Sequence, residues 1–216
     1  MAALLRPFMP KTYAQMDRYA LAWAAANAAA ERETGPLWVV LGDSAAQGIG
    51  TPAHDQGYVG VVLDRLRRST GEPWRVINLS RSGAKTAELV QKQWPQAQDL
   101  PAELLTAIVG GNDAVWTPLD KWIQDIDAVT EVLPAGAVVA TVARGVREKK
   151  TRVANAHLRA RAEEKQLRVA DLWRHTGPPY RGLYFDGFHP NEHGYEQWVD
   201  ALGEALELPP SGGSAS

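Results

Sequence analysis

The sequence predicts a single α/β domain in which helices cover both faces of a five-stranded parallel sheet. Two observations support this prediction: five short apolar runs recur along the chain, and a stretch with the apolar spacing of a helix follows each of them. Strands that alternate with helices pair in parallel, and right-handed crossovers place helices on both faces of the sheet. The length of 216 residues fits one such domain, and neither an internal repeat nor a linker divides it.

The predicted strands are short and aliphatic, as strands buried on both faces are. The first, at 37–42, reads LWVVLG and ends on a glycine. The other four are predicted at 74–79, 104–109, 137–142 and 167–172.

The helices between the strands are predicted from apolar residues at spacing i, i+3, i+4 and i+7. The last helix, at 191–206, has this spacing in Tyr195, Trp198, Val199 and Leu202. Earlier helices are predicted at 58–68, 86–94, 119–133 and 148–165. Pro95 is expected to end the helix at 86–94, because proline interrupts a helix interior.

An amphipathic helix is also predicted before the first strand, at 11–33, with an apolar face of Tyr13, Met16, Tyr19, Ala20 and Trp23. Its Ala-rich centre is too short and too weakly apolar to span a membrane, so at most weak surface contact with a membrane is expected. A weak export signal stays open, because basic residues precede the Ala-rich stretch. Otherwise we expect a cytoplasmic protein.

Three segments are therefore expected along the chain: the N-terminal helix with its lead-in at 1–35, the α/β domain at 36–208 and a tail at 209–216. The tail reads PPSGGSAS, a composition typical of disorder.

Composition excludes several classes of protein. The chain has no cysteine, which rules out disulfides, cysteine-bound zinc, iron–sulfur clusters and a thiol nucleophile. The net charge of -2 gives no basic surface for a phosphate backbone, so we expect no nucleic-acid partner. Hydrophobic residues make up 45% of the chain, enough to build a core without covalent cross-links.

Four polar loops that contain glycine follow the predicted strands. They are 42–44 (GDS), 78–83 (NLSRSG), 110–113 (GGND) and 186–190 (DGFHP). Each has an ordinary interpretation on its own, since serine often caps a helix and GGND favours a turn. Parallel sheets, however, bind ligands at the carboxyl ends of their strands. Together the loops predict an active site at that edge.

In these four loops the chain resembles the SGNH hydrolases, also called the GDSL esterase/lipase family. The family's blocks are represented by Ser44 in GDSAAQG, Gly83 in NLSRSGA, Asn112 in GGND, and Asp186 with His189 in DGFHP. The blocks stand in the family's order, each at a strand end. The resemblance covers about 37–206 and implies a flavodoxin-like three-layer α/β/α domain.

The resemblance also implies an ester hydrolase that needs neither cofactor nor metal and acts on a small-molecule ester. Ser44 is the expected nucleophile, His189 the base that takes its proton, and Asp186 the carboxylate that orients the imidazole. The backbone N–H groups of Ser44 and Gly83 and the side-chain amide of Asn112 are the expected donors to the oxyanion. Asparagine suits this role because its amide donates, whereas an ionised aspartate only accepts.

Other functions remain open at this point. The same site serves an acyltransferase if an alcohol replaces water as the acceptor, and a non-catalytic binding module is a weaker alternative. The segment 189–193 matches H-x-x-E-H, a zinc-protease pattern, although Pro190 disfavours the helix that this pattern requires. An α/β-hydrolase elbow is disfavoured, because Ala46 stands where G-x-S-x-G has its second glycine.

Residues near the four blocks are expected to be mainly structural. Asp43 and Asp113 are predicted to brace their loops, and His54 is expected in a solvated loop. Trp116 is a candidate wall of an acyl pocket. The loops are short and carry no insertion that resembles a lid, so we expect small or short-acyl esters as substrates.

Overall fold

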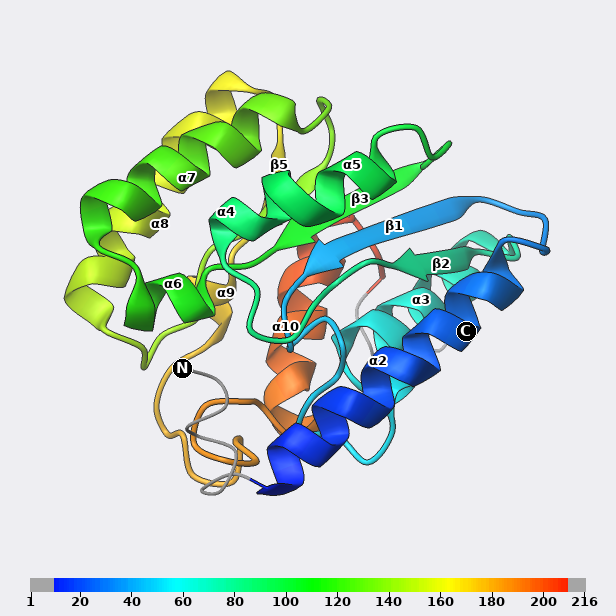
Figure 1. Cartoon of the computed structure of the whole chain (residues 1–216), viewed down its shortest axis with the longest axis horizontal. Helices are drawn as coiled ribbons and strands as arrows, with labels where there is room; N and C mark the ends of the chain where they lie inside the picture. The colour runs from blue at the N-terminus through cyan, green and yellow to red at the C-terminus, as the bar shows by residue number, and fades with distance from the viewer. Residues whose placement is uncertain (1–9, 210–216) are drawn as a thin grey trace.

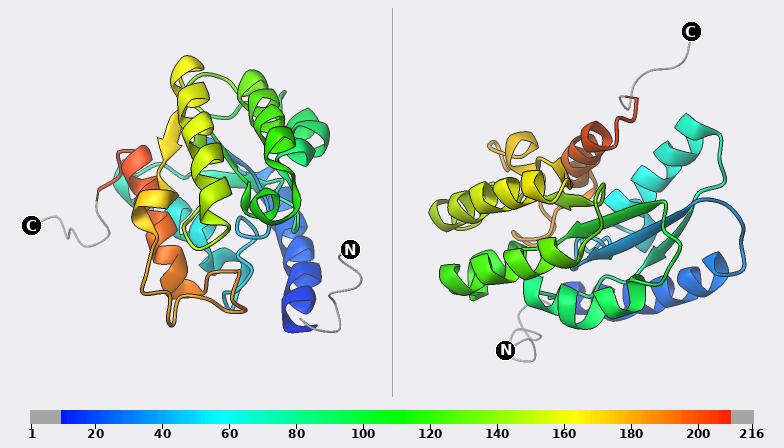
Figure 2. Two further views of the ribbon diagram at one scale, coloured as in Figure 1. Left: turned by 90° about the vertical axis from the view of Figure 1, so that its left-hand side faces the viewer. Right: turned by 90° about the horizontal axis from the view of Figure 1, so that it is seen from above.

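A computed structural model describes residues 10–209 of the chain. Its centre is an all-parallel five-stranded sheet with strand order β2-β1-β3-β4-β5. Helices lie on both sides of the sheet (Figures 1 and 2). The three-layer α/β/α architecture and the parallel sheet predicted from the sequence are confirmed. The predicted lead-in at 1–9 and all but the first residue of the predicted tail lie outside the described residues.

The strands match the predicted apolar runs but are mostly shorter. They are β1 (Leu37–Gly42), β2 (Arg75–Asn78), β3 (Leu104–Ile108), β4 (Val138–Ala140) and β5 (Arg168–Ala170). The fifth strand was expected to reach residue 172, which is wrong. It ends early because Asp171 caps α9 (Leu172–His175) by accepting the backbone N–H of Arg174.

Two helical layers enclose the sheet. One contains α3 (Tyr58–Thr70) and α10 (Glu192–Ala205), and the other contains α7 (Leu119–Val132) and α8 (Glu148–Glu164). The predicted helix at 86–94 joins this second layer as three consecutive segments: α4 (Thr86–Glu88), the π-helical η3 (Leu89–Gln93) and α5 (Trp94–Ala97). The expected stop before Pro95 is wrong. Pro95 lies in the first turn of α5, where its missing N–H costs little.

The N-terminal helix α2 (Pro10–Ala30) runs beside β2, at the edge of the sheet (Figure 1). Asn27 receives a hydrogen bond from the backbone N–H of Asn78 and donates one to its carbonyl, so it satisfies the exposed edge of the strand. The buried face of α2 includes Tyr19 and Trp23 as expected, but Ala20 is exposed and Thr12 is buried. Among residues 10–209, no helix is long and apolar enough to cross a membrane.

Two further short helices were not predicted. They are η2 (His54–Gln56), in the loop after β1, and α6 (Gly111–Trp116), which begins in the GGND block. Both lie beyond the carboxyl ends of strands, where short polar segments carry little apolar periodicity.

Candidate active site

Ser44, His189 and Asp186 form a continuous hydrogen-bonded chain. Ser44 Oγ lies 2.9 Å from His189 Nε2, and His189 Nδ1 lies 2.7 Å from Asp186 Oδ2. Ser44 follows β1 directly, whereas the other two residues lie in the loop before α10. Ser44 and His189 are only 3% and 6% exposed. The structure therefore joins residues that are far apart in the sequence. The DGFHP block was expected at the end of the fifth strand, which is wrong, because α9 lies between β5 and this block.

The loop that carries His189 is folded around the Asp186 carboxylate. Oδ1 of Asp186 accepts the backbone N–H groups of Phe188 (3.0 Å) and His189 (2.8 Å). Burial raises the pKa of Asp186, but the hydrogen bond and the charge of His189 outweigh it, and the pKa lies below its ordinary value. Asp186 is therefore ionised, and its Oδ2 accepts a hydrogen bond from the N–H at His189 Nδ1. This leaves Nε2 free to accept the hydroxyl proton of Ser44.

The turn that presents Ser44 is held by Gln93. The Gln93 amide donates to the carbonyl of Gly42 and accepts its backbone N–H, each at 2.8 Å. A Cβ on Gly42 would lie 2.8 Å from Cβ of Ala46 and 2.9 Å from the carbonyl of Ile108, so only glycine fits there. Gln93 lies in the π-helical segment η3, and π-helical turns are frequent at functional sites.

Asp43 braces the loop that carries Ser44, as predicted. Its Oδ1 accepts the backbone N–H of Ala45 at 2.9 Å, and Asn112 Nδ2 lies 3.4 Å from its Oδ2. Burial is the main cause that raises the pKa of Asp43 to about 6, against the lowering effects of the Ala45 hydrogen bond and the His189 charge. Asp113 also braces its loop, since its carboxylate accepts three hydrogen bonds, two from Thr86 and one from Thr117.

Of the expected oxyanion donors, Gly83 lies in the loop after β2 and Asn112 lies in the first turn of α6. Asn112 Nδ2 donates to the carbonyl of Ala84, next to Gly83, at 3.1 Å. Its second contact, to Asp43, is long at 3.4 Å, so one amide proton is held only weakly. Gly83 has φ +78, a left-handed conformation that favours glycine, and nothing lies within 4 Å of a Cβ built there. Backbone conformation therefore explains this glycine better than crowding does.

A pocket opens beside Ser44 and His189. Its walls are largely apolar, with Ile108, Val142, Leu172, Phe188 and Trp198 among them. Trp116, the sequence candidate for this wall, does not line the pocket and is 50% exposed. Pocket residues outside the four blocks come from β3, the segment after β4, α9, the loop before α10, and α10 itself, and no sequence motif marked them.

The H-x-x-E-H segment does not form the paired-histidine site of a zinc protease. Asn191 caps α10, which begins at Glu192, so His189 lies outside the helix. His193 is exposed and lies 3.6 Å from Glu196, whereas the His189 ring contacts Ser44 and Asp186. Within residues 10–209, no group of three or more His, Asp or Glu side chains could hold a metal ion.

Comparison with known proteins gives the family. Residues 40–197, more than half of the chain, match the profile of the GDSL-like lipase/acylhydrolase family. A search of curated protein sequences finds no match.

Similar solved structures include a lipase, Lip_vut3, from a goat rumen metagenome (TM-score 0.68, 18% identity, 79% of this chain and 97% of that chain). TesA has TM-score 0.67 and 18% identity over 79% of this chain and 98% of that chain. Axe2, an acetylxylan esterase from Geobacillus stearothermophilus, has TM-score 0.66 and 17% identity over 82% of this chain and 96% of that chain. At these identities the neighbours support the fold, and the profile supports the family. The chain belongs to the GDSL-like lipase/acylhydrolase family of carboxylic ester hydrolases.

Proposed function

We propose that the protein is a serine esterase that cleaves small or short-acyl carboxylic esters through a seryl ester. Ser44 is the nucleophile, His189 the general base and Asp186 the residue that orients the imidazole. The observation that carries this proposal is the hydrogen-bonded chain from Ser44 Oγ to His189 and on to Asp186.

The proposed reaction begins when His189 Nε2 takes the hydroxyl proton as Ser44 Oγ attacks the ester carbonyl. The tetrahedral intermediate places its negative oxygen against the N–H groups of Ser44 and Gly83 and the amide of Asn112. The imidazolium then protonates the leaving alcohol, and the acyl group stays on Ser44. A water molecule, activated by His189 in the same way, releases the acid.

The lining of the pocket supports a small acyl group. Bulky side chains, Phe188 and Trp198 among them, line the pocket beside Ser44, and we infer that they limit the length of acyl chain that it accepts. Among the similar structures, Axe2 is an acetylxylan esterase, so acetylated sugars belong in the substrate panel.

A fluorophosphonate probe tests the nucleophile. We expect it to label the wild-type protein at Ser44 and to leave Ser44→Ala unlabelled, with activity lower by at least about 10⁴-fold and an unchanged fold. Labelling of Ser44→Ala at the wild-type rate would refute the assignment.

A series of p-nitrophenyl esters, run beside acetylated sugars, tests the substrate. We expect kcat/KM to be highest for acetate or butyrate, and a preference for long acyl chains would refute the short-acyl part. Product analysis with an added alcohol separates hydrolysis from acyl transfer: free acid is expected as the main product.

A further inference from the structure

The N-terminal helix α2 contacts the carboxylate of Asp186. The hydroxyl of Thr12 donates to Asp186 Oδ2 at 2.8 Å, and Thr12 is only 2% exposed. This helix lies before residues 40–197, which match the family profile, so the family blocks do not account for the contact.

The Thr12 hydroxyl completes the set of donors around Asp186. An ionised carboxylate offers about four lone-pair sites. Oδ1 receives the backbone N–H groups of Phe188 and His189, and Oδ2 receives His189 Nδ1 and the Thr12 hydroxyl. Backbone groups of the loop hold Oδ1, whereas Oδ2, the oxygen that faces the imidazole, is held from outside the loop by Thr12.

We propose that Thr12 is a positioning residue for the reaction: its hydroxyl fixes Asp186 Oδ2 where it orients His189, and α2 is thereby part of the working active site. This inference rests on the proposed function, because it assumes that His189 is the base. Thr12 touches neither Ser44 nor the pocket, so it acts through Asp186.

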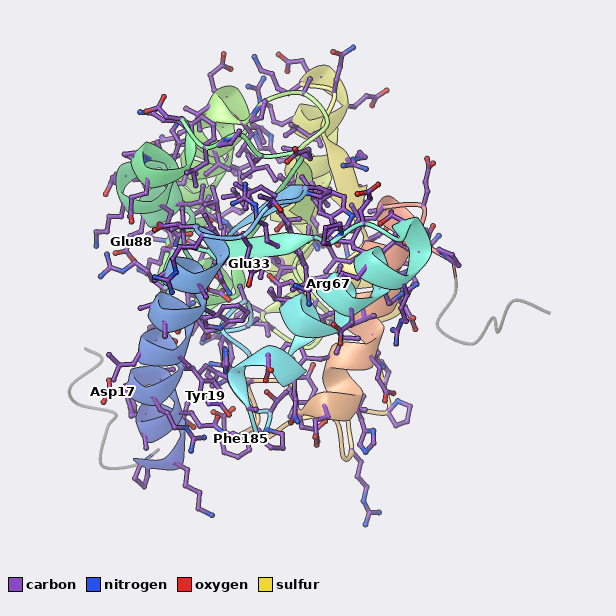
Figure 3. The ribbon with its side chains drawn as sticks, turned by 90° about the vertical axis from the view of Figure 1, so that its right-hand side faces the viewer. Asp17, Tyr19, Glu33, Arg67, Glu88 and Phe185 are labelled. Carbon is purple, nitrogen blue, oxygen red and sulfur yellow. The ribbon has the colours of Figure 1, made fainter. Side chains whose placement is uncertain are left out.

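The docking of α2 explains how Thr12 is held in place. Gln15, one turn further along the helix, accepts the backbone N–H of Gly50 at 3.0 Å and donates to the carbonyl of Thr51 at 3.1 Å. The Tyr19 hydroxyl donates to the same carbonyl at 2.6 Å, and Trp23 Nε1 donates to the carbonyl of Gln47 at 3.2 Å. Figure 3 shows Tyr19 pointing from α2 toward this loop. The helix thus ties the Ser44 loop to the Asp186 loop.

Loss of the hydroxyl has a defined electrostatic consequence. With one donor fewer, less of the negative charge on the Asp186 carboxylate is compensated, so the carboxylate interacts more strongly with the imidazolium that forms during the reaction. The orientation of Oδ2 is also less fixed, which lowers the rate of proton transfer. Asp43 also interacts electrostatically with His189, as Tyr195 does with Asp186, and the substitution leaves both of these groups unchanged.

The test compares Thr12→Val, which has nearly the same shape but no hydroxyl, with Thr12→Ser, which keeps it. Tyr19→Phe is the matched control, because it removes one buried hydroxyl from the same helix without contact to Asp186. Each variant is titrated with the fluorophosphonate probe to count active sites, and kcat and KM for a short p-nitrophenyl ester are measured across pH.

For Thr12→Val we expect kcat per active site to fall about tenfold, as for loss of a hydrogen bond to a charged group. KM should change little, and the acidic limb of kcat/KM should move up by roughly half a pH unit. Thr12→Ser is expected to restore both. Tyr19→Phe is expected to lower stability and, because its hydroxyl does not contact Asp186, to leave the acidic limb of the pH profile where it lies in the wild type.

If Thr12→Val keeps the wild-type kcat and acidic limb, the inference is wrong. It is equally wrong if Tyr19→Phe reproduces both changes, because general loosening of α2 then explains them. Should Thr12→Val fail to fold, Thr12→Ala and Thr12→Ser provide the same comparison. Failure of the proposed function has a different signature: the wild type itself is then not labelled at Ser44.

Discussion

Asp43 makes the stability of this protein depend on pH in the direction opposite to that of an ordinary paired carboxylate. Burial raises its pKa in the folded state to about 6, from an ordinary value of 3.8. Between these values the folded state binds more protons than the unfolded state, so the contribution of Asp43 to stability falls as pH rises. With about 1.4 kcal/mol for each unit of pKa difference, the full effect is about 3 kcal/mol, of which roughly 2 kcal/mol falls between pH 4.5 and 7.5.

Asp43→Asn removes this titration and keeps the shape of the side chain. We expect the unfolding free energy of the variant, relative to the wild type, to increase by roughly 2 kcal/mol as pH rises from 4.5 to 7.5. Loss or gain of contacts to Ala45 and Asn112 adds an offset that does not change with pH. The pKa of Asp186 is lowered in the folded state, so its contribution to the unfolding free energy is lost at low pH. This loss is the same in the wild type and in Asp43→Asn, so it does not affect the difference between them.

Urea denaturation at a series of pH values measures the difference, with Asp55→Asn as the control. Asp55 lies in the same connection between β1 and α3, but its side chain is 63% exposed, so solvent screens its charge. Its ion-pair contact, from Oδ1 to His54 Nδ1, is long at 4.0 Å. We expect its removal to give a nearly constant difference. A constant difference for Asp43→Asn as well would refute the assignment of a raised pKa to this carboxyl.

Three further predictions concern the residues that shape the site. Asn112→Ala should lower kcat by about 10²–10³-fold with little change in KM if the amide is an oxyanion donor, and steady-state kinetics measures this. Gly83→Ala should cost about 1–2 kcal/mol in urea denaturation, because φ is +78 there, while circular dichroism shows an intact fold, since no atom crowds the new Cβ. Gln93→Leu should cost about 1–3 kcal/mol in the same assay, because it leaves the buried N–H of Gly42 without this acceptor, and a variant as stable as the wild type would contradict this.

The parts of the fold that could be predicted are those fixed by apolar burial. All six residues of β1 are buried, and its bounds are the predicted ones, because a strand covered on both faces has an uninterrupted apolar run. Prediction failed where a polar contact decides an element's end. The apolar run predicted that the fifth strand continues to Leu172, but the Asp171 carboxylate caps α9 by accepting the backbone N–H of Arg174. A hydropathy pattern does not reveal such a hydrogen bond.

The candidate site divides in the same way. Ser44, His189 and Asp186 were found because their blocks have a fixed order, and the structure joins Ser44 to His189 and His189 to the Asp186 carboxylate. The contact from Thr12 was missed, because the face of α2 was judged by hydropathy, which chose Ala20. The buried face of α2 also includes polar side chains that bind residues distant in the sequence, as Thr12 binds Asp186. Apolar periodicity does not predict such a contact.

The missed residues share one property: their side chains form hydrogen bonds to the loops that carry the proposed reacting groups. Gln93 holds the end of β1, and Gln47 donates to the carbonyl of Ser80 at 3.0 Å and accepts the hydroxyl of Ser82, which ties the Ser44 loop to the loop of Gly83. Gln47 is 4% exposed, so solvent does not compete for these bonds. An oxyanion site works only if its donors are fixed before charge develops. We therefore expect the rate to depend on the buried side-chain amides of Gln47 and Gln93 and on the Thr12 hydroxyl, which act through other residues. It also depends on the groups proposed to contact the substrate.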